Sequence, residues 1–149
     1  MHCVWRSVLL LGTDGAASNN DLNLWEEMDT AAKLHKVFSS DPKVVSAVQV
    51  FEMATIRGAR ALHMADSIGS IENGKLADIV IVDMDGLHQT PMYNIYSHLV
   101  YVTKSTDVRT VIIHGRIVMQ DRRLLTLNEN AIKTEAIAYR KKIVESLKN

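Results

Sequence analysis

Only one cysteine, Cys3, occurs among the 149 residues, and this excludes an internal disulfide and any zinc site built from several cysteines. Basic and acidic residues balance, with 17 of each, so no overall field draws the chain to nucleic acid or to an anionic membrane. No apolar run approaches the roughly 20 residues of a membrane-spanning helix. These absences predict a cytoplasmic globular protein that binds neither nucleic acid nor a membrane.

The first apolar run, Val8 to Leu11, is too short for a signal peptide, whose apolar core takes about 7–15 residues. We interpret it as a β-strand, with residues 1–6 as an unassigned leader. Residues 11–20 then read LGTDGAASNN and place Asp14 directly after this strand. In a (β/α)8 barrel, metal-binding and catalytic groups follow the strands in this way.

Three helices are predicted after this loop. Their apolar side chains recur at three- and four-residue spacing over residues 22–37, from Pro42 through Phe51, and from Ile56 to Leu62. Asp21 is the predicted N-cap of the first helix, and proline at the first helical position opens the second.

The second half of the chain has the pattern of a small β unit. A strand is predicted over residues 78–83, and a hairpin over residues 108–119 with His114-Gly115 as its two-residue turn. Thr126 and Glu129 form a capping-box pair ahead of a helix that ends near Leu147. The predicted class is therefore α/β.

Four strings in this order carry a resemblance to a known family: LGTDGAASNN at 11–20, GSIENGKLADIV at 69–80, PMYN with SHLVY within 91–101, and VIIHGR at 111–116. Together they closely resemble the carboxy-terminal part of amidohydrolases, above all of methylthioadenosine/S-adenosylhomocysteine deaminases. The resemblance covers about residues 7–147.

The resemblance implies that the chain is the carboxy-terminal fragment of a metal-dependent (β/α)8 (TIM) barrel, followed by part of a small β-sandwich and a final helix. The implied division has a leader, the last barrel strand with its helices, the sandwich part and the terminal helix: residues 1–6, 7–65, 66–125 and 126–149.

The same resemblance makes Asp14 a catalytic residue, a ligand of a divalent metal such as Zn²⁺ and a proton shuttle. Ser18 and Asn19 follow it and are candidate substrate-binding residues. Residue type alone favours another interpretation, because aspartate and asparagine in turns commonly bond their own backbone. The family's remaining ligands are histidines of earlier strands. None of the six histidines here has the H-x-H spacing of that set, so those ligands are absent from this chain.

The implied reaction is hydrolytic: activated water attacks the purine carbon that bears the amino group, and ammonia leaves. The implied substrate is a purine nucleoside such as methylthioadenosine or S-adenosylhomocysteine. A guanine- or triazine-type amidohydrolase is the other enzymatic option.

Two non-catalytic alternatives remain beside the enzymatic interpretation. In the first, the chain is a truncated product or a partner that completes another chain's barrel, since a barrel needs about 250 residues and eight strands. A small binding module that keeps the loop without catalysis is a weaker alternative. An unpaired apolar strand also favours self-association.

The isolated, zinc-loaded chain is therefore expected to release no ammonia from methylthioadenosine and to self-associate. A coupled ammonia assay and light scattering after gel filtration measure both properties. Turnover at an ordinary enzymatic rate would contradict the fragment interpretation.

Overall fold

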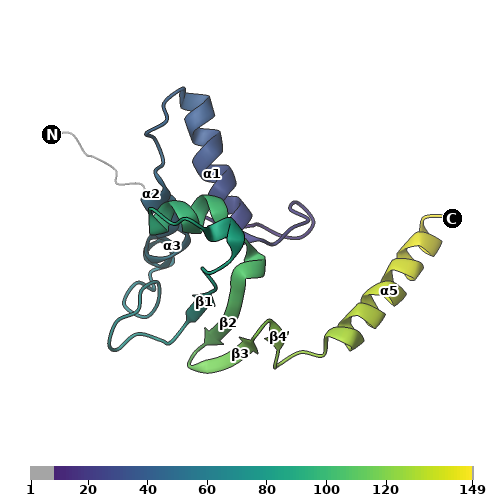
Figure 1. The fold of residues 1–149 in the computed structure, drawn as a ribbon. Helices are drawn as coiled ribbons and strands as arrows, with labels where there is room; N and C mark the ends of the chain where they lie inside the picture. The colour runs from purple at the N-terminus through teal and green to yellow at the C-terminus, as the bar shows by residue number, and fades with distance from the viewer. Residues whose placement is uncertain (1–8, 149) are drawn as a thin grey trace.

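The computed structural model describes residues 9–148 (Figure 1). The predicted leader, Cys3 and the first strand residue, Val8, lie outside the described residues. Helices and strands follow in the order α1 (Leu24–Ser39), α2 (Ala47–Ala54), α3 (Ile56–Ala61), β1 (Ile79–Val82), α4 (Ile95–Ser97), β2 (Val108–Ile113), β3 (Arg116–Gln120), β4 (Arg123–Leu124) and α5 (Glu129–Ser146). Three short helical turns complete the order: η1 (Leu87–Gln89), the π-helical η2 (His98–Val102) and η3 (Ser105–Asp107).

Helix α1 confirms the first predicted helix but begins two residues later. Asn23, not Asp21, is its N-cap, and the Asn23 side chain accepts a hydrogen bond from the backbone N–H of Trp25 at 3.2 Å. The prediction of Asp21 is wrong because apolar spacing locates the buried face of a helix and not its first turn. Leu22 remains exposed and does not belong to that face.

Helix α2 begins at Ala47, so the prediction that Pro42 opens it is wrong. Val45 has a positive φ of 47°, a conformation that no helix residue adopts. Ser46 then caps the helix in a reciprocal box with Gln49, whose side chain accepts from the Ser46 N–H at 2.9 Å. The break at Thr55 and the helix that follows it are confirmed.

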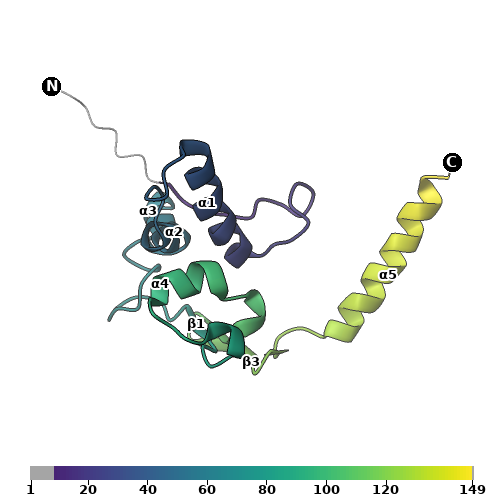
Figure 2. The same ribbon diagram turned by 45° about the horizontal axis from the view of Figure 1, so that its top comes forward.

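The hydrophobic core lies where α1, α2 and η2 meet. Its buried members are Met28 and Ala32 of α1, Val50 of α2 and Val100 of η2. Trp25 packs against them, which confirms most of the predicted apolar face of α1. The prediction is wrong for Leu34, which it placed on the same face, because the Leu34 side chain is exposed beyond the end of the core. Figure 2 shows α1 and α2 gathered on one side of the η2 segment.

Lys36 fastens the end of α1 to this core. Its ammonium donates to the carbonyls of Ala32 at 3.0 Å and Val45 at 2.8 Å, and it lies 5.8 Å from the ring centroid of Tyr101. One side chain therefore joins α1, the loop before α2 and η2.

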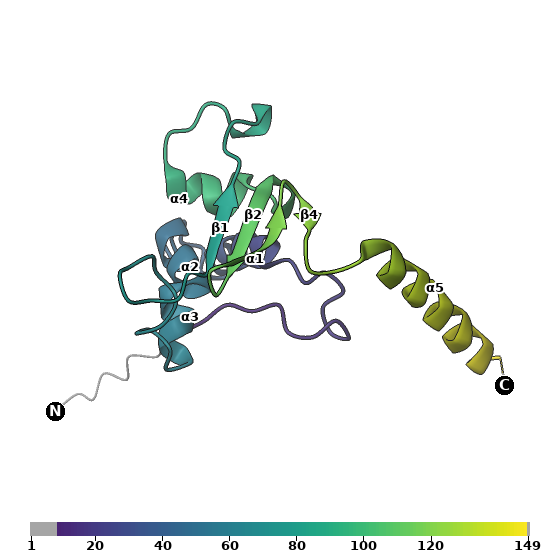
Figure 3. The same ribbon diagram turned by 90° about the horizontal axis from the view of Figure 1, so that it is seen from below.

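The four strands form one antiparallel sheet in the order β1-β2-β3-β4, seen as a single layer in Figure 3. His114 and Gly115 turn the hairpin between β2 and β3, both with positive φ, at 51° and 75°. This backbone matches the twist of a two-residue hairpin, and it confirms the predicted turn. The Asp78 carboxylate accepts from the His114 N–H at 2.6 Å and fixes the turn beside β1.

Helix α5 confirms the predicted terminal helix, with a different cap. Asn128 accepts from the Ala131 N–H at 3.1 Å, so the prediction of a capping box from Thr126 is wrong. Asparagine next to the helix provides the acceptor directly. Figures 1 and 2 show α5 projecting away from the other elements. Within residues 9–148, no helix has the length and apolarity to cross a bilayer.

The described part of the predicted first strand, Leu9 to Leu11, forms no strand. Among the described residues, this segment makes one backbone hydrogen bond to another element: the Leu11 N–H donates to the Met53 carbonyl oxygen of α2 at 3.3 Å. A strand persists only with hydrogen-bonded neighbours, and the sheet of this chain lies elsewhere.

Replacing Met28 by alanine is expected to lower the free energy of unfolding by about 2–5 kcal/mol, because a buried side chain leaves a cavity. Met64, 42% exposed, is the matched control, and Met64→Ala is expected to cost far less. Urea titration followed by circular dichroism measures both; equal losses would contradict the assigned core.

Alanine substitutions at Gly69 and Gly74 provide a second matched comparison of stability. Both have φ near +90°, but a Cβ at Gly69 would lie 2.7 Å from the Ala59 Cβ, whereas Gly74 faces open space. Gly69→Ala is therefore expected to cost about 1–3 kcal/mol more than Gly74→Ala, since only the first adds a clash in packed structure. Thermal unfolding of the two variants measures the difference, and equal melting temperatures would refute it.

Candidate functional site

Asp14 lies on the exposed loop that precedes α1, the purple loop that projects from the helices in Figure 2. Its φ is 57°, a left-handed conformation that aspartate tolerates better than most residues. Both carboxylate oxygens accept one hydrogen bond: Oδ1 from the Gly15 N–H at 2.7 Å and Oδ2 from the Ser18 hydroxyl at 2.9 Å. The loop therefore sets the orientation of the carboxylate.

These bonds also favour the ionised form of the carboxyl group. The Ser18 hydroxyl and, after it, the Gly15 N–H lower the pKa of Asp14 below its ordinary value, because both donors favour the ionised form. A carboxylate oxygen has two lone pairs, so each oxygen of Asp14 keeps acceptor capacity after its single bond. An exposed, ionised carboxylate with free lone pairs is suited to serve as one ligand of a hard or borderline cation.

Ser18 and Asn19 occupy the same loop but already have partners, in the loop and in the first turn of α1. The side-chain Nδ2 of Asn19 donates to the Glu27 carboxylate at 2.6 Å, and the side-chain Oδ1 of Asn19 accepts from the Asp21 N–H at 3.2 Å. Asn19 thus ties the loop to the first turn of α1. Sequence reasoning missed Glu27, because nothing but its place in a first helical turn marked it.

The structure brings no set of metal ligands together around Asp14. In the part of the chain that it describes, no three side chains among histidine, cysteine, aspartate and glutamate are grouped to hold a metal ion. A catalytic zinc takes three protein ligands and one open position. Asp14 therefore fits one place in such a set, and the described residues do not supply the others.

A second polar cluster, which the sequence did not reveal, connects η1 with η3. The Asp107 Oδ2 atom accepts from the Gln89 amide at 3.0 Å and the Lys104 N–H at 2.8 Å, and lies 3.0 Å from Nε2 of His88. Burial raises the pKa of Asp107, but the bonds from His88, Lys104 and Gln89 outweigh it and lower the pKa. His98 is buried with its Nε2 3.1 Å from the Gln89 backbone carbonyl oxygen, a contact that joins η2 to η1.

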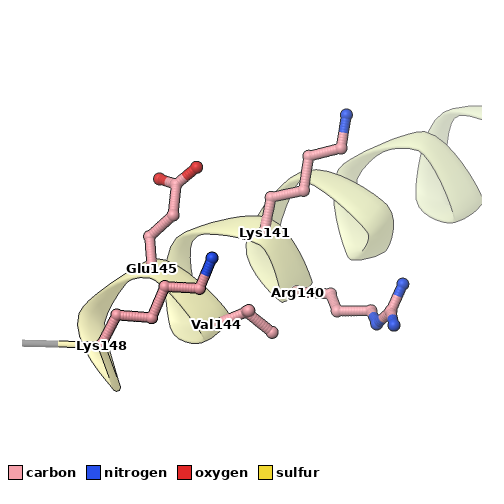
Figure 4. Close-up of a pocket in the computed structure, with 5 residues that line it drawn as sticks. All are labelled: Arg140, Lys141, Val144, Glu145 and Lys148. Carbon is pink, nitrogen blue, oxygen red and sulfur yellow. The ribbon is translucent and has the colours of Figure 1, made fainter.

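Two surface hollows lie away from Asp14. One is on α5, lined by Arg140, Lys141, Val144, Glu145 and Lys148 (Figure 4). The other is at the end of the β3–β4 hairpin, lined by Gln120, Asp121, Arg123 and Leu125. Neither contains a predicted site residue.

Replacing Ser18 by alanine is expected to raise the pKa of Asp14 towards its ordinary value, because the larger of the two stabilising hydrogen bonds is lost. Thr13→Val is the matched control, since the Thr13 hydroxyl donates to the Asp14 backbone carbonyl and not to its carboxylate. Carbon-13 NMR titration of the carboxyl group measures both. A pKa unchanged by Ser18→Ala would show that the hydroxyl does not act on the carboxylate.

Two similar proteins are 5-methylthioadenosine/S-adenosylhomocysteine deaminases. The protein of Syntrophobacter fumaroxidans is 54% identical over 129 residues, which cover 87% of this chain and 29% of that protein. Enzyme 1 of Syntrophus aciditrophicus is 50% identical over 138 residues, 93% of this chain and 31% of that protein. The chain spans about 30% of the length of these relatives.

A solved structure has the same fold over nearly all of this chain. The crystal structure of an adenosine deaminase from Xanthomonas campestris with bound zinc matches 93% of the chain with a TM-score of 0.90 and 39% identity, and the match spans 31% of that protein. The α/β arrangement described above, with its small antiparallel sheet, therefore occurs within a longer, zinc-containing protein.

The sequence profile of the amidohydrolase family matches residues 7–118. This range holds the Asp14 loop, the core helices and most of the sheet. The chain belongs to the amidohydrolase family.

Proposed function

We propose that this chain acts as the carboxy-terminal part of a metal-dependent amidohydrolase that removes the amino group of a purine nucleoside. The observation that carries the proposal is the Asp14 carboxylate, ionised, exposed and oriented by Ser18 and Gly15. The names of the two bacterial relatives support methylthioadenosine or S-adenosylhomocysteine as the substrate.

In this proposal the chain has three functional parts. Residues 7–65 are the last strand and helices of a barrel, residues 66–125 belong to a β-sandwich, and residues 126–149 form the terminal helix. The single antiparallel sheet from β1 to β4 and the separate α5 support the last two divisions. Leu9 to Leu11 take the conformation of a barrel strand only when strands on both sides provide hydrogen bonds.

The proposed reaction is a hydrolysis in which atoms balance without an oxidant. The oxygen of water bonds to the purine carbon that bears the amino group, and the carbon–nitrogen bond breaks. One proton of the water leaves with the amine as ammonia, and the other ends on the adjacent ring nitrogen of the carbonyl product. A bound divalent metal, Zn²⁺ in this proposal, supplies Lewis acidity near neutral pH. Asp14 would be one of the residues that hold that metal, and its carboxylate would accept a proton from the attacking water and return it to the leaving amine.

Ser18 and Asn19 have different roles in this proposal. Ser18 orients Asp14 through Oδ2, and its hydroxyl lies at the loop surface where a substrate would approach. Asn19 is engaged with Glu27 and with the Asp21 N–H, so its contribution to substrate binding comes from holding the loop on α1.

The test uses a hybrid enzyme, defined as the Syntrophus aciditrophicus deaminase with its 138 matched residues replaced by those of this chain. Asp14→Asn in the hybrid is expected to lower kcat/KM for methylthioadenosine by more than about 100-fold, since even the outer partners of metal ligands are worth about 10- to 100-fold. It is also expected to lower the zinc content.

Asp21→Asn is the matched control, because Asp21 is an exposed aspartate of the same loop. The control is expected to keep both activity and zinc. An Asp14→Asn hybrid with full zinc and full turnover would refute the assignment of Asp14. A hybrid that binds zinc but acts on no purine nucleoside would refute the substrate class alone.

A further inference from the structure

Most hydrogen bonds of the Asp14 loop, residues 13–21, join residues close together in the sequence. Asp14 accepts from Gly15 and Ser18, and the N–H groups of Ser18 and Asn19 both donate to the Gly15 carbonyl oxygen, at 3.0 and 2.9 Å. None of these bonds spans more than four residues. They fix the shape of the loop, but they do not fix its place on the helices.

Among the described residues, one hydrogen bond leads from this loop to another element. The side-chain Nδ2 of Asn19 donates to the Glu27 carboxylate at 2.6 Å, in a partly buried position. A hydrogen bond to an ionised acceptor is stronger than one between neutral groups, and partial exclusion of water strengthens it further. The bond between Asn19 and Glu27 therefore relates the loop to α1.

Glu27 is itself held by the core. It directly precedes Met28, whose side chain is buried, and its N–H donates to the carbonyl oxygen of the N-cap Asn23 at 3.2 Å. The neighbouring Glu26 is exposed, whereas Glu27 is half-buried. A side chain on a packed helix is placed more precisely than one on a loop, so Glu27 is a rigid attachment point for the loop.

From these observations we infer that Glu27 is a positioning residue for the deamination proposed above, because through Asn19 it fixes the place of the Asp14 loop on α1. The inference rests on the proposed function, which makes Asp14 a metal ligand and a proton acceptor. Displacement of a reacting group by about 1 Å costs up to about 100-fold in rate. Asn19 then acts on the reaction through Glu27 and not by touching the substrate.

Exchange of the donor and the acceptor in the hybrid enzyme tests this role. Asn19→Asp brings two carboxylates together, and kcat for methylthioadenosine is expected to fall by about 10- to 100-fold, as for other outer partners of metal ligands. KM is expected to change by less than about threefold, since the placement of Asp14 affects the chemical step more than substrate binding. Adding Glu27→Gln restores the bond with its direction reversed, and the double variant is expected to recover about tenfold in kcat.

Asn20→Asp is the matched control, because it adds the same charge to the adjacent, exposed residue. It is expected to leave kcat near that of the hybrid. A double variant no more active than Asn19→Asp would overturn the inference, since a change at Glu27 does not restore an Asn19 side chain that touches the substrate. Equal losses in Asn19→Asp and Asn20→Asp would also overturn it, because added charge alone would then explain them.

Backbone order in the loop separates this inference from the proposed function. Nitrogen-15 relaxation of the full 149-residue chain without metal gives order parameters for residues 14–19. These are expected to fall below about 0.6 in Asn19→Asp and to return towards about 0.85 in the double variant. Unchanged order in Asn19→Asp would overturn the inference, whatever the hybrid does. A hybrid without deaminase activity, in a protein whose loop order follows the pair, would refute the proposed function and support the attachment through Glu27.

Discussion

The packing of α1 against α2 and η2 is the contact on which the rest of the structure depends. Ala32, Val50 and Val100 are almost completely excluded from water at its centre, beside the buried Met28. Helix α1 in turn holds the Asp14 loop, because Glu27 in its first turn accepts a hydrogen bond from the Asn19 side chain. The position of the candidate ligand thus follows from a small apolar core some distance away along the chain.

Local patterns in the sequence predicted the elements whose geometry depends on residues adjacent in the sequence. The His114-Gly115 turn is an example, because two positive φ values in a two-residue loop specify a hairpin. The caps of α1, α2 and α5 were predicted at the wrong residues, because several polar side chains stand near each helix start and only the packed helix selects one. The Asp107 cluster could not be predicted, since its donors come from η1 and from the backbone before η3.

The residues of the candidate site were likewise predicted only in part. Asp14 was found through a resemblance that spans the whole loop, and its partners Gly15 and Ser18 lie within four residues of it. Glu27 escaped notice because its bond to Asn19 depends on how the loop folds back on α1. Leu9 to Leu11 show the opposite failure, since a correct apolar pattern forms no strand without strands beside it.

The short range of the bonds around Asp14 has a consequence for assembly. Gly15 and Ser18 fix the carboxylate within one loop, so its conformation does not depend on closure of a barrel. The entropy of ordering this carboxylate is therefore lost when the loop folds and not when the carboxylate binds a partner. In the proposed role of Asp14 as a metal ligand, its carboxylate is therefore already oriented by its own loop before the remaining ligands are brought to it.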